Sequence, residues 1–144
     1  GNPTPIDWGE LYSALQQGVV DMAENNPTAL TNARHGEVVS HFSLNEHTII
    51  PSVVVMSNCA WDAMTEEQQS AMRQAALDAQ SFHTESWNAI ARAALETAQS
   101  EMNVEINEVE KGPFIEAVLP MHDEVAAQSP ALAELIERIK AAAN

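Results

Sequence analysis

Residues 65–103 form the stretch that most constrains the fold, because no glycine or proline interrupts them. Thr65 and Gln68, three positions apart, make a capping-box pattern that marks the start of a helix. Apolar residues then recur at helical spacing as far as Met102. A continuous helix here would span roughly 55 Å, more than the width of a small domain. The sequence therefore predicts one long helix that bridges two lobes. Alanine dominates its apolar positions, which disfavours a coiled coil.

Shorter elements flank this helix on both sides. Helical spacing and capping residues predict helices at 8–17, at 27–34, just after Asn58, from Gly112-Pro113 to a stop or kink at Pro120, and from Ser129-Pro130 onward. β-Branched or alternating runs predict strands at 19–24, at 47–57 with a bend at Pro51, and at 104–109. Residues 37–44 are ambiguous and fit one or two short amphipathic turns. This mixture of helices and strands favours an α/β fold.

Three polar residues, Glu24, Asn25 and Asn26, follow the predicted strand 19–24 and precede Pro27. In open α/β sheets, ligands bind at the carboxyl ends of strands, where loops and helix N-termini converge. We therefore expect these residues to form the polar rim of a small-molecule site. In the alternative interpretation, Asn26 caps the next helix and Asn25 is a turn residue, so that local backbone needs explain both.

Trp8 opens the predicted helix 8–17 after a turn that contains Pro5. A tryptophan there can fill a hydrophobic core or cover a ligand in a cleft. An aromatic face, the paired amides Asn25 and Asn26, and a lobe-bridging helix are together typical of a closing site for a carbohydrate or an organic acid.

Composition excludes several classes of partner. Six Lys and Arg residues against 21 Asp and Glu residues give a net charge of −15, which disfavours nucleic acid and anionic membranes. One cysteine, Cys59, allows neither an internal disulfide nor a thiolate metal cluster. No apolar run approaches the ~20 residues of a membrane span. The N-terminus has no leader pattern, so if the protein is exported, its signal peptide lies outside these residues.

Motifs for catalysis or metal binding are not found. His35, His41 and His47 are six positions apart, which does not match the spacing of a helical zinc motif. The sequence has no Gly-x-Ser-x-Gly elbow and no glycine-rich phosphate loop, and Cys59 has no basic neighbour in sequence. We therefore predict no enzyme, no metal site and no cofactor. Two alternatives stay open: a helical interaction module that self-associates through residues 65–103, and a hydrolase built around Cys59 or a histidine.

Several motifs resemble the solute-binding proteins of tripartite ATP-independent periplasmic (TRAP) transporters, the DctP-like family. The resemblance rests on PTPIDWGELYSALQQGVVD (3–21), AENNP (23–27), Glu37-Val38, Glu46-His47 and WDAMTEEQQ (61–69). It covers essentially every residue of this chain but only about half of the family's length. It therefore identifies the chain as similar to the C-terminal half of such a protein.

The resemblance implies a bilobed α/β solute-binding fold with a long helix that runs across both lobes. It implies that residues 1–50 belong to the second lobe and carry the ligand motif, that 51–90 cross into the first lobe, and that 91–144 return to the second. In this family a cleft arginine binds the ligand carboxylate, and guanidinium is well suited to that task. None of the chain's arginines lies at the matching position: Arg34, Arg73, Arg92 and Arg138. The anchoring arginine is therefore expected in the missing N-terminal half.

The resemblance also implies roles for residues of this chain. Trp8 is similar to the aromatic residue that lines the cleft, and Asn25 to the amide that binds the ligand carboxylate. Glu24 and Asn26 flank that amide as candidates for hydroxyl contacts. His47 falls where the family can place a cleft residue.

The function implied is that of a periplasmic protein that captures a carboxylate-bearing solute and delivers it to a membrane permease driven by an ion gradient. The Glu-Asn-Asn motif resembles members that take sugar acids such as uronates. The alternative ligand is a C4-dicarboxylate or another small organic acid. The implied partners are the ligand, the permease subunits and the N-terminal half, and the protein itself is not expected to span the membrane.

Overall fold

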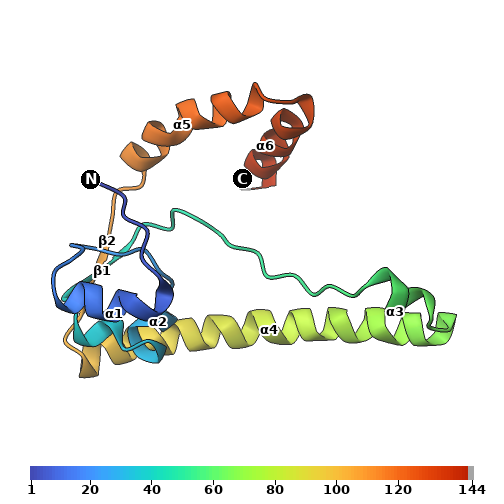
Figure 1. The fold of residues 1–144 in the computed structure, drawn as a ribbon, viewed down its shortest axis with the longest axis horizontal. Coiled ribbons are helices and arrows are strands. Elements are labelled where there is room, and N and C mark those ends of the chain that lie inside the picture. The colour runs from blue at the N-terminus through green and yellow to red at the C-terminus, as the bar shows by residue number, and fades with distance from the viewer. Residues whose placement is uncertain (143–144) are drawn as a thin grey trace. The chain divides into compact units, whose positions relative to one another are not determined.

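The computed structural model describes residues 1–142, and the chain divides into two compact units (Figure 1). The first unit, Gly1–Asn107, contains the helices α1 to α4, a short 3-10 helix η1, the strand β1 and all of β2 except its last residue. The second unit begins at Glu108 and contains α5 and α6. The predicted helices and strands of the site region all belong to the first unit.

Helix α4 extends from Glu66 to Glu101 without interruption, which confirms the predicted long helix. Its capping box forms as the sequence indicates: Gln68 N donates to Thr65 Oγ1 at 3.3 Å, and Thr65 N donates to Gln68 Oε1 at 2.9 Å. Two acidic residues in the first turn, Glu66 and Glu67, lie where the helix dipole favours negative charge. Local rules alone are therefore sufficient to start this helix.

The short helix α3 (Asn58–Asp62) precedes α4 and packs on its first turns. Ser57 caps α3 by accepting a hydrogen bond from Ala60 N at 3.2 Å. Gln69 Nε2 of α4 donates to the Trp61 carbonyl oxygen at 2.9 Å, and the Arg73 guanidinium lies 4.5 Å from the centre of the Trp61 ring. These contacts fix the corner at the N-terminal end of α4.

The two strands, β1 (His41–Leu44) and β2 (Glu105–Glu108), form a two-stranded sheet. Glu105 N donates to the Ser40 carbonyl at 2.9 Å, and Ser43 Oγ donates to Asn107 Oδ1 at 3.2 Å. From the first of these contacts to the second, the residue numbers increase on both strands, so the strands are parallel. Strand β2 confirms the strand predicted at 104–109, whereas the ambiguous stretch 37–44 ends in β1.

Two predicted strands were wrong. In the stretch predicted at 19–24, residues 19–21 form a bend and 22–24 are irregular, and residues 45–57 are also irregular. In the second stretch the β-branched side chains are open to solvent, with Val54 88% exposed. A strand needs a partner for its backbone hydrogen bonds, and within residues 1–142 neither stretch pairs with another strand. High β-propensity alone therefore did not produce a strand.

Helix α2 (Thr28–Asn32) packs on the C-terminal part of α4 and supplies the centre of the core. Leu30, Ala98 and Val104 are buried together. Partly buried side chains surround them: Val39, Phe42, Leu95, Met102 and Ile106. Figure 1 shows α1 and α2 near this end of α4, with α3 at the other end. The core therefore fixes α2, the helix that forms the floor of the candidate site.

Helix α1 (Trp8–Gln16) confirms the helix predicted at 8–17, and Gly18 follows it with a positive φ of 69°. In the second unit, α5 spans Gly112–Ala126 and continues through Pro120, so this proline does not end the helix. Helix α6 spans Pro130–Ala142, and its first turn is capped by Ser129 Oγ, which accepts from Leu132 N at 3.2 Å. Helices α5 and α6 pack against each other.

Candidate functional site

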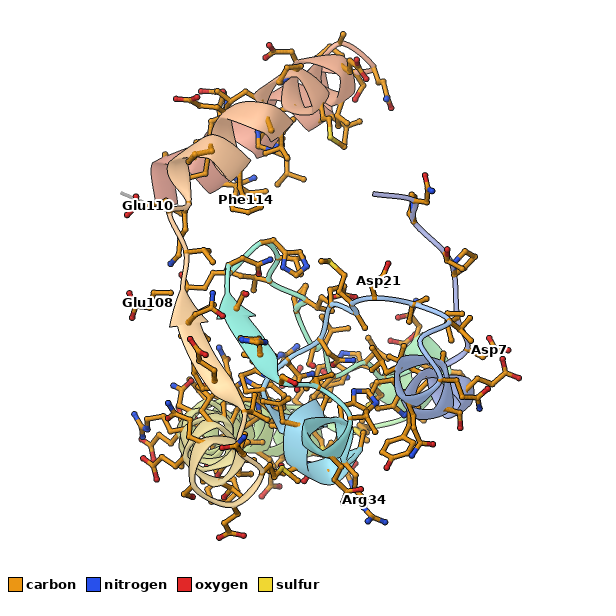
Figure 2. The ribbon with its side chains drawn as sticks, turned by 90° about the vertical axis from the view of Figure 1, so that its left-hand side faces the viewer. Asp7, Asp21, Arg34, Glu108, Glu110 and Phe114 are labelled. Atoms are coloured by element: carbon orange, nitrogen blue, oxygen red, sulfur yellow. The ribbon has the colours of Figure 1, made fainter. Side chains whose placement is uncertain are left out.

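A hollow of about 390 Å³ lies between the start of α1 and one face of α2. We call it the amide hollow, and its lining residues are Trp8, Asn25, Asn26, Thr28, Ala29, Asn32 and Ala33. The last four lie on α2 or directly after it. They share one helix face, because positions four apart on a helix are neighbours. Figure 2 shows α1, with Asp7 at its start, beside α2, and Asp21 in the loop between them. The volume of the amide hollow falls within the usual range for small-molecule sites.

The amide oxygens of Asn25 and Asn26 are both engaged by the local backbone. Asn25 Oδ1 accepts from Asn26 N at 2.9 Å. Asn26 Oδ1 accepts from Thr28 N at 3.1 Å and from Thr28 Oγ1 at 2.6 Å. A backbone N–H can donate only to the oxygen of a side-chain amide, so these contacts fix which end of each amide is which. Among residues 1–142 the NH₂ groups of both side chains make no hydrogen bond, so they remain as donors.

Trp8 forms an aromatic wall of the amide hollow. It is 59% exposed, so it does not fill the core. Its ring lies 5.3 Å from the ring of His35, tilted by 57°. His35 is only 5% exposed, and burial lowers the pKa of its imidazole. Trp8 therefore contacts a buried imidazole ring on one side and leaves most of its surface exposed.

A second contact holds α1 one turn later. Tyr12, four residues after Trp8 and on the same helix face, donates from its hydroxyl to Glu37 Oε2 at 3.0 Å. Arg34, which adopts a left-handed φ of 60°, donates to Glu37 Oε1 at 2.7 Å. The hydrogen bond from Arg34 lowers the pKa of Glu37, and the bond to Glu37 raises the pKa of Tyr12. The 3-10 helix η1 (His35–Glu37) thus contacts α1 twice, at Trp8 through His35 and one turn later at Tyr12 through Glu37.

Glu24 and His47 lie together but outside the amide hollow. His47 Nε2 is 3.4 Å from Glu24 Oε2, and His47 Nδ1 is 2.8 Å from Asn45 Oδ1. Of the five residues predicted for the site, Trp8, Asn25 and Asn26 line the hollow, while the other two form this pair. The polar residues reach the site on an irregular loop rather than at the end of a strand.

Sequence reasoning missed the contribution of α2 to the site. Four lining residues lie on it or at its end: Thr28, Ala29, Asn32 and Ala33. Their i, i+1, i+4, i+5 spacing is a helix-face pattern and was the available signal. It was missed because the sequence alone does not tell which face of a short helix packs on α4.

Other features of the chain offer less chemistry. A hollow of about 300 Å³ beside β1 and β2 contains none of the predicted site residues. Cys59 is exposed, and within residues 1–142 no group of three His, Cys, Asp or Glu side chains is arranged to hold a metal ion. Among the helices that the structure describes, none is both long and apolar enough to cross a membrane.

The first unit combines helices and a two-stranded sheet with a hollow lined by one aromatic ring and three amides. The family model DctP, described as bacterial extracellular solute-binding protein, family 7, matches residues 1–129. The chain belongs to this family, as its motifs indicated. The family is one of solute-binding proteins, and the solved structures similar to this chain are described as periplasmic.

Two solved structures and one curated relative illustrate the similarity. A TRAP periplasmic solute-binding protein from Chromohalobacter salexigens DSM 3043 with bound D-glucuronate is 34% identical, with a TM-score of 0.89 over 99% of this chain and 47% of that chain. One from Sulfitobacter sp. NAS-14.1 with bound β-D-galacturonate is 34% identical, with a TM-score of 0.82 over 94% and 45%. The C4-dicarboxylate-binding periplasmic protein DctP of Rhodobacter capsulatus is 29% identical over 97% of this chain and 42% of its own length. The chain spans less than half the length of these relatives.

Proposed function

We propose that the protein is the periplasmic solute-binding protein of a TRAP transporter and that it captures a uronate. The observation that carries the proposal is the orientation of Asn25 and Asn26, whose oxygens are held by the backbone and whose NH₂ groups remain as donors. A carboxylate has only acceptors, so a wall of donors suits it. Trp8 beside these donors offers an aromatic face to a sugar ring.

The amide hollow favours a sugar acid over a smaller dicarboxylate. It combines the Trp8 face and the methyl groups of Ala29 and Ala33 with three amides, which suits a ring that has both apolar and hydroxyl-bearing surfaces. The structures with bound D-glucuronate and β-D-galacturonate support this choice. The Rhodobacter capsulatus relative supports the alternative, a C4-dicarboxylate. We propose Glu24 and His47 as further contacts on the rim, held together by their 3.4 Å pair.

The anchoring positive charge is proposed to come from the N-terminal half of a family-length protein. Arg34, the arginine nearest in sequence to the motif, is bound to Glu37 rather than to the hollow. In this proposal residues 1–50 and 91–144 belong to the second lobe and 51–90 cross into the first. The closed protein then delivers its ligand to the membrane permease.

Ligand binding by the full-length protein tests the proposal. Differential scanning fluorimetry is run with D-glucuronate, D-galacturonate, succinate and malate, because a ligand at a hundred times its Kd adds about 2.7 kcal/mol of stability. Isothermal titration calorimetry then gives the affinity of each acid. The substitution Asn25→Ala should weaken binding of the preferred acid. Asn88→Ala, an exposed asparagine on α4, is the matched control. If no organic acid shifts the unfolding temperature, the solute-binding proposal is wrong.

A further inference from the structure

Asn32 differs from the other two amides of the amide hollow. It lies on α2, one turn after Thr28, and its side chain is exposed. Among residues 1–142 its side chain makes no hydrogen bond, whereas the oxygens of Asn25 and Asn26 are both occupied. Asn32 is therefore the amide of the hollow that has both its oxygen and its NH₂ group available to a ligand.

This difference matters because ligand groups differ in what they offer. A carboxylate only accepts hydrogen bonds, and Asn25 and Asn26 have only donors left for it. A hydroxyl both donates and accepts, so it is best matched by a group that can do both. Within the hollow Asn32 meets that requirement.

The surroundings of Asn32 allow a ring to come close. Ala29 and Ala33 lie beside it on the same helix face, and Ala29 is buried. Their side chains are single methyl groups, which leave room for a ring above them. Glu24 could also accept from a hydroxyl, but it is paired with His47 and lies outside the lining of the hollow. The position of Asn32 is fixed because α2 packs on α4 through Leu30.

We propose that Asn32 binds a ring hydroxyl of the sugar acid, while Asn25 and Asn26 bind its carboxylate. This division of roles rests on the proposed function and makes Asn32 the residue that distinguishes hydroxylated acids from acids without that hydroxyl. It predicts that the energetic effect of Asn32 depends on one particular ligand hydroxyl.

A cycle of protein and ligand changes tests the proposal in the full-length protein. Affinities for D-glucuronate and its 1-, 2-, 3- and 4-deoxy analogues are measured by calorimetry for the unchanged protein and for Asn32→Ala. We expect Asn32→Ala to weaken D-glucuronate binding about tenfold, the effect of one hydrogen bond. We expect one deoxy analogue to bind both proteins equally. Asn25→Ala should weaken binding of all analogues by a similar factor, and the control Asn88→Ala should change none.

The outcomes separate this inference from the proposed function. An unchanged affinity of Asn32→Ala for D-glucuronate, or an equal loss for every analogue, would overturn the role given to Asn32. If the unchanged protein binds no uronate, the proposed function itself fails. Circular dichroism confirms folding, and Asn32→Leu, which keeps the side-chain size without hydrogen-bonding groups, repeats the test if the alanine variant unfolds. In Asn32→Leu, the ligand hydroxyl identified with Asn32→Ala should likewise no longer contribute to the affinity.

Discussion

Gly36 lies at the contact between the site region and the core, and replacing it by alanine should destabilise the protein. A Cβ atom at this position would lie 2.5 Å from Met102 Sδ and 3.2 Å from the Leu30 carbonyl oxygen. Both distances are shorter than an ordinary van der Waals contact. Leu30 is 3% exposed in the core, so its backbone has little room to move.

The size of the effect follows from these two contacts. The Met102 side chain can shift, because its thioether is flexible, but it must give up core packing. The Leu30 carbonyl must move by a few tenths of an ångström. Overpacking of this kind costs about 1–3 kcal/mol. The unfolded state also loses entropy when alanine replaces glycine, which offsets about 0.4–1 kcal/mol. We therefore expect Gly36→Ala to destabilise the protein by about 1–2 kcal/mol.

Denaturant unfolding of the full-length protein measures this change as a lower midpoint with an unchanged m-value. Gly9→Ala is the matched control, since a Cβ there has nothing within 4 Å and Gly9 lies inside α1. Alanine favours a helix over glycine, so the control should be neutral or stabilising by about 0.5 kcal/mol. If the two variants unfold at the same midpoint, the close packing inferred around Gly36 is wrong.

Three further predictions concern the long helix, the buried imidazole and the aromatic wall. Thr65→Ala removes the oxygen that caps α4 and should cost about 1 kcal/mol in denaturant unfolding, whereas Thr84→Ala inside the helix should not destabilise. The pKa of His35 is lowered by burial, so as the pH falls below about 6.5 the imidazole binds a proton more readily in the unfolded chain than in the native protein. The free energy of unfolding should therefore fall as the pH drops through that range, and an equal fall in His35→Gln would contradict this assignment. Trp8→Ala should weaken uronate binding about tenfold in calorimetry with little change in the unfolding temperature, since Trp8 is largely exposed, and unchanged binding would remove it from the site.

The helices could largely be predicted from the sequence because their hydrogen bonds are local. The capping box of Thr65 and Gln68 forms as the spacing indicated, and α4 ends at Glu101, close to the predicted 103. Helix α1 and the start of α6 at Pro130 were predicted for the same reason. Each of these elements bonds residues three or four positions apart, so its signal lies within one short stretch. Family motifs likewise lie in the sequence, and they identified the class of protein.

The strands and the site depended on tertiary structure. β-Branched residues at 19–24 and 47–57 predicted strands that have no partner here, while β1 pairs with β2 across more than sixty positions. The sequence by itself determined the long helix, the acidic charge and the motif that carries Asn25 and Asn26. Only the packing of α2 on α4 decided that Asn32 shares a hollow with them, and only the contact with His35 placed Trp8 at its wall. The reason is that the strand pair, and the meeting of Trp8 with the lining residues at 25–33, join segments distant in sequence, and their meeting depends on the core.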